Sequence, residues 1–207
     1  MDDERVVAQV VNGSREAFDE LVRRHRGPIY TLIRTLAGDE SDAEDLTQEC
    51  FVRAYVAIVR FRREASFRTW LTRIAVNVVR THLARQRRAR QPVSLDAVED
   101  GEPSSTDAAL VVSSDLEASL TRRQAIERAL ALLPEDYRIA LTLRDVYGFE
   151  YHEIAGVLHV PIGTVESRVF RARRRLRPLL RQWLKRSAPS HADLQGCVRV
   201  DRAQRRR

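Results

Sequence analysis

The stretch that decides the fold reads YHEIAGVLHVPIGTVESR and spans residues 151–168. Its apolar residues recur at helical spacing on both sides of a short turn. Ala155 is small enough to stand where two helices cross, and His159 occupies the turn, where a left-handed backbone is preferred and histidine tolerates it. The pattern predicts a helix-turn-helix, held together by Ile154, Leu158, Val160 and Val165.

The arginine-rich helix that follows, expected at about 163–185, has two distinct faces. At about 100° per residue, an apolar stripe should pack inward, made of Val165, Val169, Ala172, Leu176, Leu180 and Trp183. Ser167, Phe170, Arg171 and Arg174 fall on the opposite face, with Arg168 and Arg175 to one side of the stripe. Guanidinium groups pair with phosphate and with the guanine edge, so this face suits the major groove of DNA. A solvated arginine helix without a ligand is the plainer alternative, and the narrow major groove of RNA disfavours an RNA-binding helix.

The rest of the chain also predicts helices and no strands. A helix at about 120–133 should stop at Pro134, which we expect at the first position of the next helix, about 135–147. In the first half, we expect three helices. The first spans about residues 18–36. The second begins after Ser41 as N-cap, with Glu44 at N3, and runs to Arg60, and the third spans 67–88 after a Ser66 cap. The fold class is therefore all-α, with two small helical domains.

Charge divides the chain further. Its 207 residues contain 36 Lys and Arg against 29 Asp and Glu, a net charge of +7, and Lys185 is the only lysine. Residues 91–119 contain seven carboxylates and no Lys or Arg, a composition typical of a flexible linker. We therefore expect domains at 1–90 and 120–186, with a flexible basic tail at 187–207.

Composition also excludes several classes of protein. No apolar run reaches the roughly 18 residues of a membrane span, and the acidic start at Met1–Arg5 does not resemble a signal peptide. Two cysteines are too few for a disulfide scaffold, and we expect Cys50 to be a buried core thiol. The expectation is a cytoplasmic, basic protein that binds a polyanion.

Two stretches of the first domain carry further signals. In DAEDLTQECF, residues 42–51, the acids Asp42, Asp45 and Glu49 share one helix face, and the helix beyond them is apolar on most sides. The helix dipole accounts for an acidic first turn but not for Gln48 or Glu49. Residues 61–77 interleave aromatic side chains with arginines, which suits unstacked single-stranded bases. The alternative for Phe67, Trp70 and Leu71 is a place in the core.

Together these motifs resemble the sigma-70 family of RNA polymerase sigma factors, in its extracytoplasmic-function (ECF) group. The resemblance covers about 16–90 and 120–181. It rests on four motifs in order: residues 42–51, Thr69–Asn77, Leu133–Asp136 and Gly163–Arg173. It implies that the first domain is sigma region 2 and the second is region 4. The family docks on the β′ coiled coil and the β subunit of core RNA polymerase, reads promoter DNA and is often held by an anti-sigma factor.

The resemblance assigns roles to residues that match the family's motifs. Core-polymerase binding falls on Asp42, Asp45, Gln48 and Glu49. Recognition and melting of the −10 element fall on Phe61, Arg62, Ser66, Arg73, Asn77, Arg80 and Arg85. Recognition of the −35 element falls on Thr164, Glu166, Ser167, Arg168, Phe170, Arg171 and Arg174. Arg63 replaces a frequent glycine and Glu166 a frequent basic residue, which bears on which promoter is read.

Two other classes of function compete with this interpretation. A stand-alone helix-turn-helix regulator would need the second domain but neither residues 42–51 nor residues 61–77. An enzyme would need a nucleophile or a metal set, and the five histidines show no ligand spacing. We therefore expect no catalytic activity, no metal and no cofactor.

Overall fold

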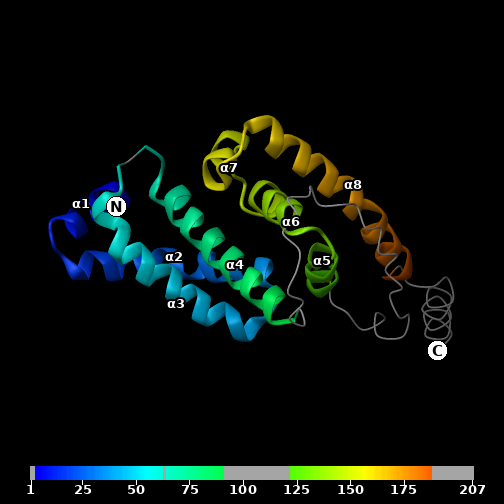
Figure 1. The fold of residues 1–207 in the computed structure, drawn as a ribbon, viewed down its shortest axis with the longest axis horizontal. Helices are drawn as coiled ribbons and strands as arrows, with labels where there is room; N and C mark the ends of the chain where they lie inside the picture. Colours follow the sequence, from blue (N-terminus) through cyan, green and yellow to red (C-terminus); the bar gives the residue numbers. More distant parts are fainter. Residues whose placement is uncertain (1–2, 63, 91–121, 188–207) are drawn as a thin grey trace, which may run out of the picture.

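The computed structural model describes residues 3–62, 64–90 and 122–187 of the 207, and every regular element in this part of the chain is helical. The predicted linker, residues 188–207 of the predicted tail and Arg63 lie outside the described residues. Figure 1 shows the elements in chain order: α1 (Asp3–Val11), α2 (Arg15–Ala37), α3 (Glu40–Ala57), the 3-10 turn η1 (Ile58–Arg60), α4 (Phe67–Arg90), α5 (Arg122–Ala131), α6 (Glu135–Leu141), the π-helical turn η3 (Thr142–Val146), α7 (Tyr151–Leu158) and α8 (Ile162–Ser187).

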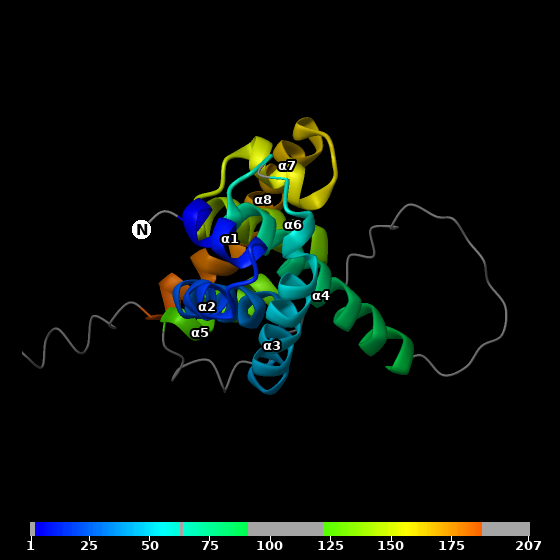
Figure 2. The same cartoon turned by 90° about the vertical axis from the view of Figure 1, so that its left-hand side faces the viewer.

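The first domain is a bundle in which α2, α3 and α4 bury their apolar faces against one another and α1 packs on α2 (Figure 2). The predicted 18–36 face is confirmed, because its leucines and isoleucines are buried. Phe67 and Leu71 are buried and Trp70 is half-buried against this core, so the core alternative for these three residues is confirmed. The fully buried side chains at its centre include Leu21, Leu32, Ile33, Leu36, Cys50 and Leu71.

Helix ends in this domain follow local hydrogen-bonding chemistry. Gly38 closes α2 in the left-handed conformation, with φ of 82°, which glycine adopts without a steric cost. Ser66 Oγ accepts a 3.1 Å hydrogen bond from the Thr69 backbone N–H at the start of α4, as predicted. Pro28 lies inside α2, and the helix continues through it.

The prediction that Ser41 caps α3 is wrong, because Asp39 has that position. Asp39 has extended backbone angles, and its carboxylate accepts from Ser41 N at 2.9 Å and from Ser41 Oγ at 3.0 Å. The backbone N–H of Ser41 lowers the pKa of Asp39, as expected for a capping carboxylate. Pro134 also differs from its prediction: it is the N-cap of α6 rather than the first helical residue.

The second domain packs the helix-turn-helix on buried apolar residues that are continuous with the core of the first domain. Phe149, Ile139, Leu143 and Ile154 are buried there, together with Val165, Val169 and Ala172 from α8. The predicted helix at about 135–147 is divided between α6 and the π-helical turn η3, and it ends before Gly148, which has a φ of 69°. The predicted helices at 151–158 and beyond 162 are confirmed as α7 and α8.

The two domains pack directly against each other, which no sequence pattern indicated. Helix α7 lies alongside the first half of α4, and α5 lies beside α2 (Figures 1 and 2). Tyr147 reaches across the boundary, where its hydroxyl donates to Pro28 O at 3.2 Å, and burial raises its pKa to about 12.

The burial of Cys50 makes a direct prediction about thiol reactivity. Burial raises the pKa of Cys50 to about 12, so its thiol stays protonated at neutral pH, and the thiolate is the reactive form. In a Cys197→Ser variant, labelling of Cys50 by a disulfide reagent should be at least roughly 100-fold slower in the native chain than in the urea-unfolded chain. Similar rates in the two states would contradict the packing of α3 on α2 and α4.

Candidate nucleic-acid interface

The capping residues of α7 and the turn after it determine how the two helices of the helix-turn-helix are oriented. Glu150 and Glu153 form a reciprocal capping box at the start of α7, with Glu150 N donating to Glu153 Oε2 at 2.9 Å. His159 ends the helix with φ of 55° and ψ of 45°, in the left-handed region. This turn brings α8 across α7, with Val165 and Val169 buried between them and the opposite face of α8 outward.

The outward face of α8 carries most of the predicted −35 residues. Phe170 is 67% exposed, an unusual position for a phenylalanine without a partner. Glu166, Arg171 and Arg174 are exposed beside it, while Thr164 is half-buried. Ser167 is also half-buried, and its hydroxyl donates to Thr164 O at 2.9 Å. The exposed set is therefore one aromatic ring flanked by two guanidinium groups and one carboxylate.

Arg168 differs from the other predicted −35 residues. Its side chain is 19% exposed and turns inward, where its NH2 group lies 2.7 Å from Asp136 Oδ2. Its NH1 group is buried without a hydrogen-bond partner. In this conformation the Arg168 guanidinium is paired with a carboxylate of α6 and does not point toward the outward face of α8.

The predicted −10 loop ends in an aromatic cluster. Phe61 is half-buried, with its ring centroid 5.2 Å from that of Trp70 and 6.1 Å from that of Phe67. Arg62 and Ser66 are exposed on either side of residue 63. The structure thus brings Phe61 together with the start of α4, at the edge of the core.

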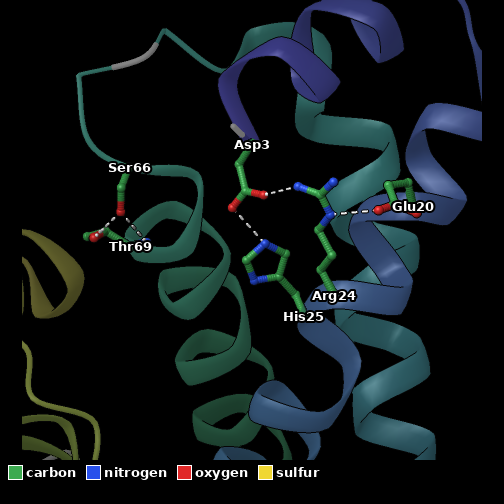
Figure 3. A network of polar contacts seen from close by, with 6 residues as sticks. All are labelled: Asp3, Glu20, Arg24, His25, Ser66 and Thr69. Atoms are coloured by element: carbon green, nitrogen blue, oxygen red, sulfur yellow. Dashed lines mark hydrogen bonds and ion pairs between the residues drawn. The ribbon is translucent and has the colours of Figure 1, made fainter. Parts of the chain in front are cut away.

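A polar network anchors the same end of the bundle (Figure 3). Asp3 of α1 accepts from Arg24 NH1 at 3.2 Å and lies 2.8 Å from His25 Nε2, and Glu20 accepts from Arg24 Nε at 2.7 Å. The His25 ring meets the Phe67 ring edge-on, with 5.2 Å between their centroids. These contacts tie α1 and α2 to the residue at which α4 begins, and so position the loop before it.

The −10 residues on α4 fall into two groups. Asn77 and Arg85 are exposed. Arg80 forms an ion pair with Asp136 of the second domain, with 2.7 Å between NH2 and Oδ1. Arg73 lies against α7, with its NH2 4.0 Å from the position a Cβ would take on Gly156, and its Nε is buried without a partner. The second domain therefore covers part of the predicted −10 surface.

The predicted docking stripe on α3 is only partly free. Asp45 and Gln48 are exposed, but Glu49 forms an ion pair with Arg53 on the same helix. Asp42 is half-buried, and its Oδ2 lies 3.1 Å from His82 Nε2 and 3.2 Å from Gln86 Nε2 of α4.

The sequence prediction missed an apolar groove next to this stripe. The groove lies between α2 and α3 and has a volume of about 620 Å³. Val52, Tyr55 and Val56 line it and are 49–71% exposed, and Val59 continues the exposed apolar surface. The sequence contained one signal for this groove: the second half of α3 is apolar on most sides. The packing of one face of such a helix in the core leaves apolar side chains on its other faces.

Two absences concern only the described residues. No cluster of three His, Cys, Asp or Glu side chains in residues 3–62, 64–90 and 122–187 could hold a metal ion. Within the same ranges, no helix combines the length and apolar character needed to cross a membrane.

Comparisons with known proteins give consistent results. The family Sigma-70 region 2 matches residues 21–89, and the family Sigma-70, region 4 matches residues 123–176. The chain is 40% identical over 187 residues to the RNA polymerase sigma-H factor of Pseudomonas aeruginosa, covering 87% of this chain and 96% of that protein. It is 38% identical over 186 residues to the ECF RNA polymerase sigma-E factor of Escherichia coli, covering 87% and 97%.

Solved structures resemble the whole arrangement. CnrH, in complex with the cytosolic domain of CnrY, matches with a TM-score of 0.62 and 27% identity over 87% of this chain and 97% of that one. RpoE of Bartonella quintana, in complex with the anti-sigma factor NepR, matches with a TM-score of 0.60 and 27% identity over 79% and 96%. With both family regions in order and relatives of this identity along most of its length, the chain belongs to the sigma-70 family of RNA polymerase sigma factors, in the ECF group.

Proposed function

We propose that this sigma factor binds core RNA polymerase and directs promoter-specific initiation, reading the −35 element with α8 and the −10 element with residues 61–66 and α4. The observation that carries the proposal is the outward face of α8, where Phe170, Arg171 and Arg174 stand exposed behind a helix-turn-helix. An exposed phenylalanine has little structural purpose in the free chain. Arg171 donates there to the Tyr137 hydroxyl at 3.5 Å, and DNA offers all three side chains a partner.

Recognition of the −35 element would combine three kinds of contact. Arg171 and Arg174 can each pair with a phosphate or with the O6 and N7 atoms of guanine. Phe170 can contact a thymine methyl group, and Glu166 can accept from cytosine N4. Because Glu166 is negative, it would also disfavour registers in which it faces a phosphate.

The −10 element would be recognised as a melted strand, without covalent chemistry. Stacking an extruded base on an aromatic ring contributes about 1–3 kcal/mol, which offsets part of the cost of unpairing. Phe61 supplies an accessible ring held in place by Phe67 and Trp70. Arg62, next to Phe61, and Arg85, in the second half of α4, are exposed and can track the phosphates. The protein would act by binding alone, so we propose no enzymatic activity.

Core polymerase would dock on the α2–α3 groove together with Asp45 and Gln48. The rim of the groove carries charges of both signs, and Asp45 is exposed next to it on α3, so the surface fits a partner that offers apolar side chains with a basic residue near Asp45. We assign this partner to the β′ coiled coil, with the β subunit as a further contact, in the cytoplasm. Because a stand-alone regulator has no use for this surface, the groove favours a sigma factor. We also propose an anti-sigma partner, by analogy with the complexes of CnrH and RpoE.

Changing α8 tests promoter reading. Arg174→Ala should weaken binding to a duplex carrying the −35 element by about 1–3 kcal/mol and lower run-off transcription by the reconstituted holoenzyme, because it removes one base or phosphate contact. The measurements are fluorescence anisotropy and transcription with purified core polymerase, on a promoter that the holoenzyme selects from a randomised library.

Arg128→Ala is the matched control, since Arg128 is an exposed arginine of α5 that lies beside Arg34 and Gly38 at the end of α2 and is not on the outward face of α8. It removes the same charge and should leave binding and transcription within about twofold, as for an exposed charge without a specific contact. Equal losses in the two variants would mean that α8 contributes only general charge. No transcript with the unaltered chain on any selected promoter would reject the proposed function.

Changing the groove tests docking. Val56 is 71% exposed, so Val56→Glu should fold normally, yet it places a charge in the apolar groove. We expect core-polymerase affinity to fall by about tenfold or more, the effect of losing an apolar contact at an interface centre, while −35 duplex binding is unchanged. Val146→Glu alters a valine of the second domain that is 58% exposed and should leave core affinity unchanged. Unaltered core binding by Val56→Glu would assign the groove to another partner.

A further inference from the structure

We propose that Asp145 is a positioning residue for −35 recognition, because it binds Arg173 and so fixes the direction in which the outward face of α8 points. Arg173 lies within the motif at 163–173, but it has no role in the function proposed above. The inference rests on that proposed function for the DNA that α8 reads. Its structural part, the orientation of α8, stands on contacts within the second domain.

The carboxylate of Asp145 accepts two hydrogen bonds from the Arg173 guanidinium. Arg173 Nε donates to Oδ2 at 3.1 Å, and NH2 donates to Oδ1 at 2.6 Å. A two-point pair of this kind fixes the plane of the guanidinium as well as its distance. The hydrogen bonds to Asp145, followed by the nearby Tyr151 hydroxyl, raise the pKa of Arg173. The pair therefore determines where the side chain of Arg173 lies.

A second set of contacts connects this pair to the start of α7. The Arg144 guanidinium, which precedes Asp145 in the chain, lies 4.7 Å from the centroid of the Tyr151 ring. Its NH1 group donates to Phe149 O and to Glu150 Oε2, both at 2.9 Å. The two neighbouring residues of η3 thus bind α7 on one side and α8 on the other.

The apolar contacts of α8 do not define its direction as sharply as this pair does. Val169 and Ala172 are buried, but apolar burial is non-directional, whereas a carboxylate–guanidinium pair is directional. Arg174, which belongs to the outward face, follows Arg173 at about 100° around the helix. A rotation of α8 that moves Arg174 therefore also moves Arg173 and strains its hydrogen bonds to Asp145.

The π-helical turn η3 determines where Asp145 points. Tyr147 N donates to Thr142 O at 3.2 Å, the i→i+5 pattern that makes this turn wider than a turn of α-helix. Side chains in a wider turn point in other directions than those of a continued α6. Such turns are frequent at functional sites. Here the turn contains the carboxylate that binds α8, so it serves −35 recognition through Asp145.

The plainer alternative is a surface ion pair without a function. The side chains of Arg173 and Asp145 are 53% and 38% exposed, and pairs with such exposure contribute little to the stability of a fold. Loss of the pair should therefore leave the second domain folded. The two interpretations differ in what happens to the discrimination between DNA sequences.

Asp145→Asn separates positioning from general electrostatics. The change removes a negative charge, so affinity for any duplex should rise if only charge matters. If Asp145 positions α8, the preference of the full chain for a −35 duplex over a scrambled duplex should fall about twofold to fivefold, the range expected for one exposed pair. The probes are two fluorescein-labelled duplexes, one with the −35 element that the holoenzyme selects, measured by anisotropy at about 0.15 M salt.

Glu4→Gln is the control, because Glu4 is an exposed carboxylate of α1 in the first domain. It removes the same charge and should leave the preference unchanged. Asp145→Arg and Arg173→Asp each place like charges side by side and should lower the preference, and their combination should restore most of it. A preference in Asp145→Asn equal to that of the unaltered chain would overturn the proposal, and so would a combined variant no better than the single changes.

A distance measurement gives a readout without DNA. Spin labels at His152→Cys on α7 and Arg181→Cys on α8, both exposed positions, report the angle between the two helices in a chain without its native cysteines. Asp145→Asn should broaden or shift the distance distribution. This change, without a preference for the −35 duplex in any of the proteins, would support the positioning of α8 and reject its proposed DNA role. An unchanged distribution would overturn the proposal, even where the holoenzyme transcribes normally.

Discussion

The attraction between the carboxylates of α6 and the arginines of α4 is the interaction on which the arrangement of this protein depends. The buried apolar residues of the two domains form one continuous cluster, so the domains also share apolar contacts. Polar contacts also cross the boundary: the pairs of Asp136 and Glu135 with Arg80 and Arg87, and the contacts of α7 with the start of α4. Polar interfaces of this kind weaken with salt and with competing anions.

The sequence was sufficient for the helices and the helix-turn-helix because those features depend on local spacing. Periodicity alone predicts the buried face of α8, which contains Val165, Val169 and Ala172. The conformational freedom of glycine predicts the end of α2 at Gly38. The prediction of the N-cap of α3 was wrong although it also depends on local sequence, because Asp39 and Ser41 are both good caps and spacing does not decide between them. Backbone geometry does, and it favours Asp39.

The candidate site was predictable only where a residue's role is independent of distant partners. Phe170 and Arg174 follow from helix geometry and are exposed as expected. Arg80 and Asp136 are 56 residues apart, and nothing in either local pattern names the other as a partner. Val52 and Val56 are apolar residues of a type usually found in a core, and their exposure beside the groove is seen only in the packing of α2 on α3.

The central claim is that the second domain, through α6 and α7, packs on α4 of the first domain in the free chain and separates from it on the polymerase. The most direct measurement is an electron–electron distance between spin labels at Ala84→Cys on α4 and His152→Cys on α7, both exposed positions, in a chain without its native cysteines. The account predicts one short distance in the free chain and a much longer one, by several tens of ångströms, in the holoenzyme bound to a promoter. The same short distance in both states would contradict it.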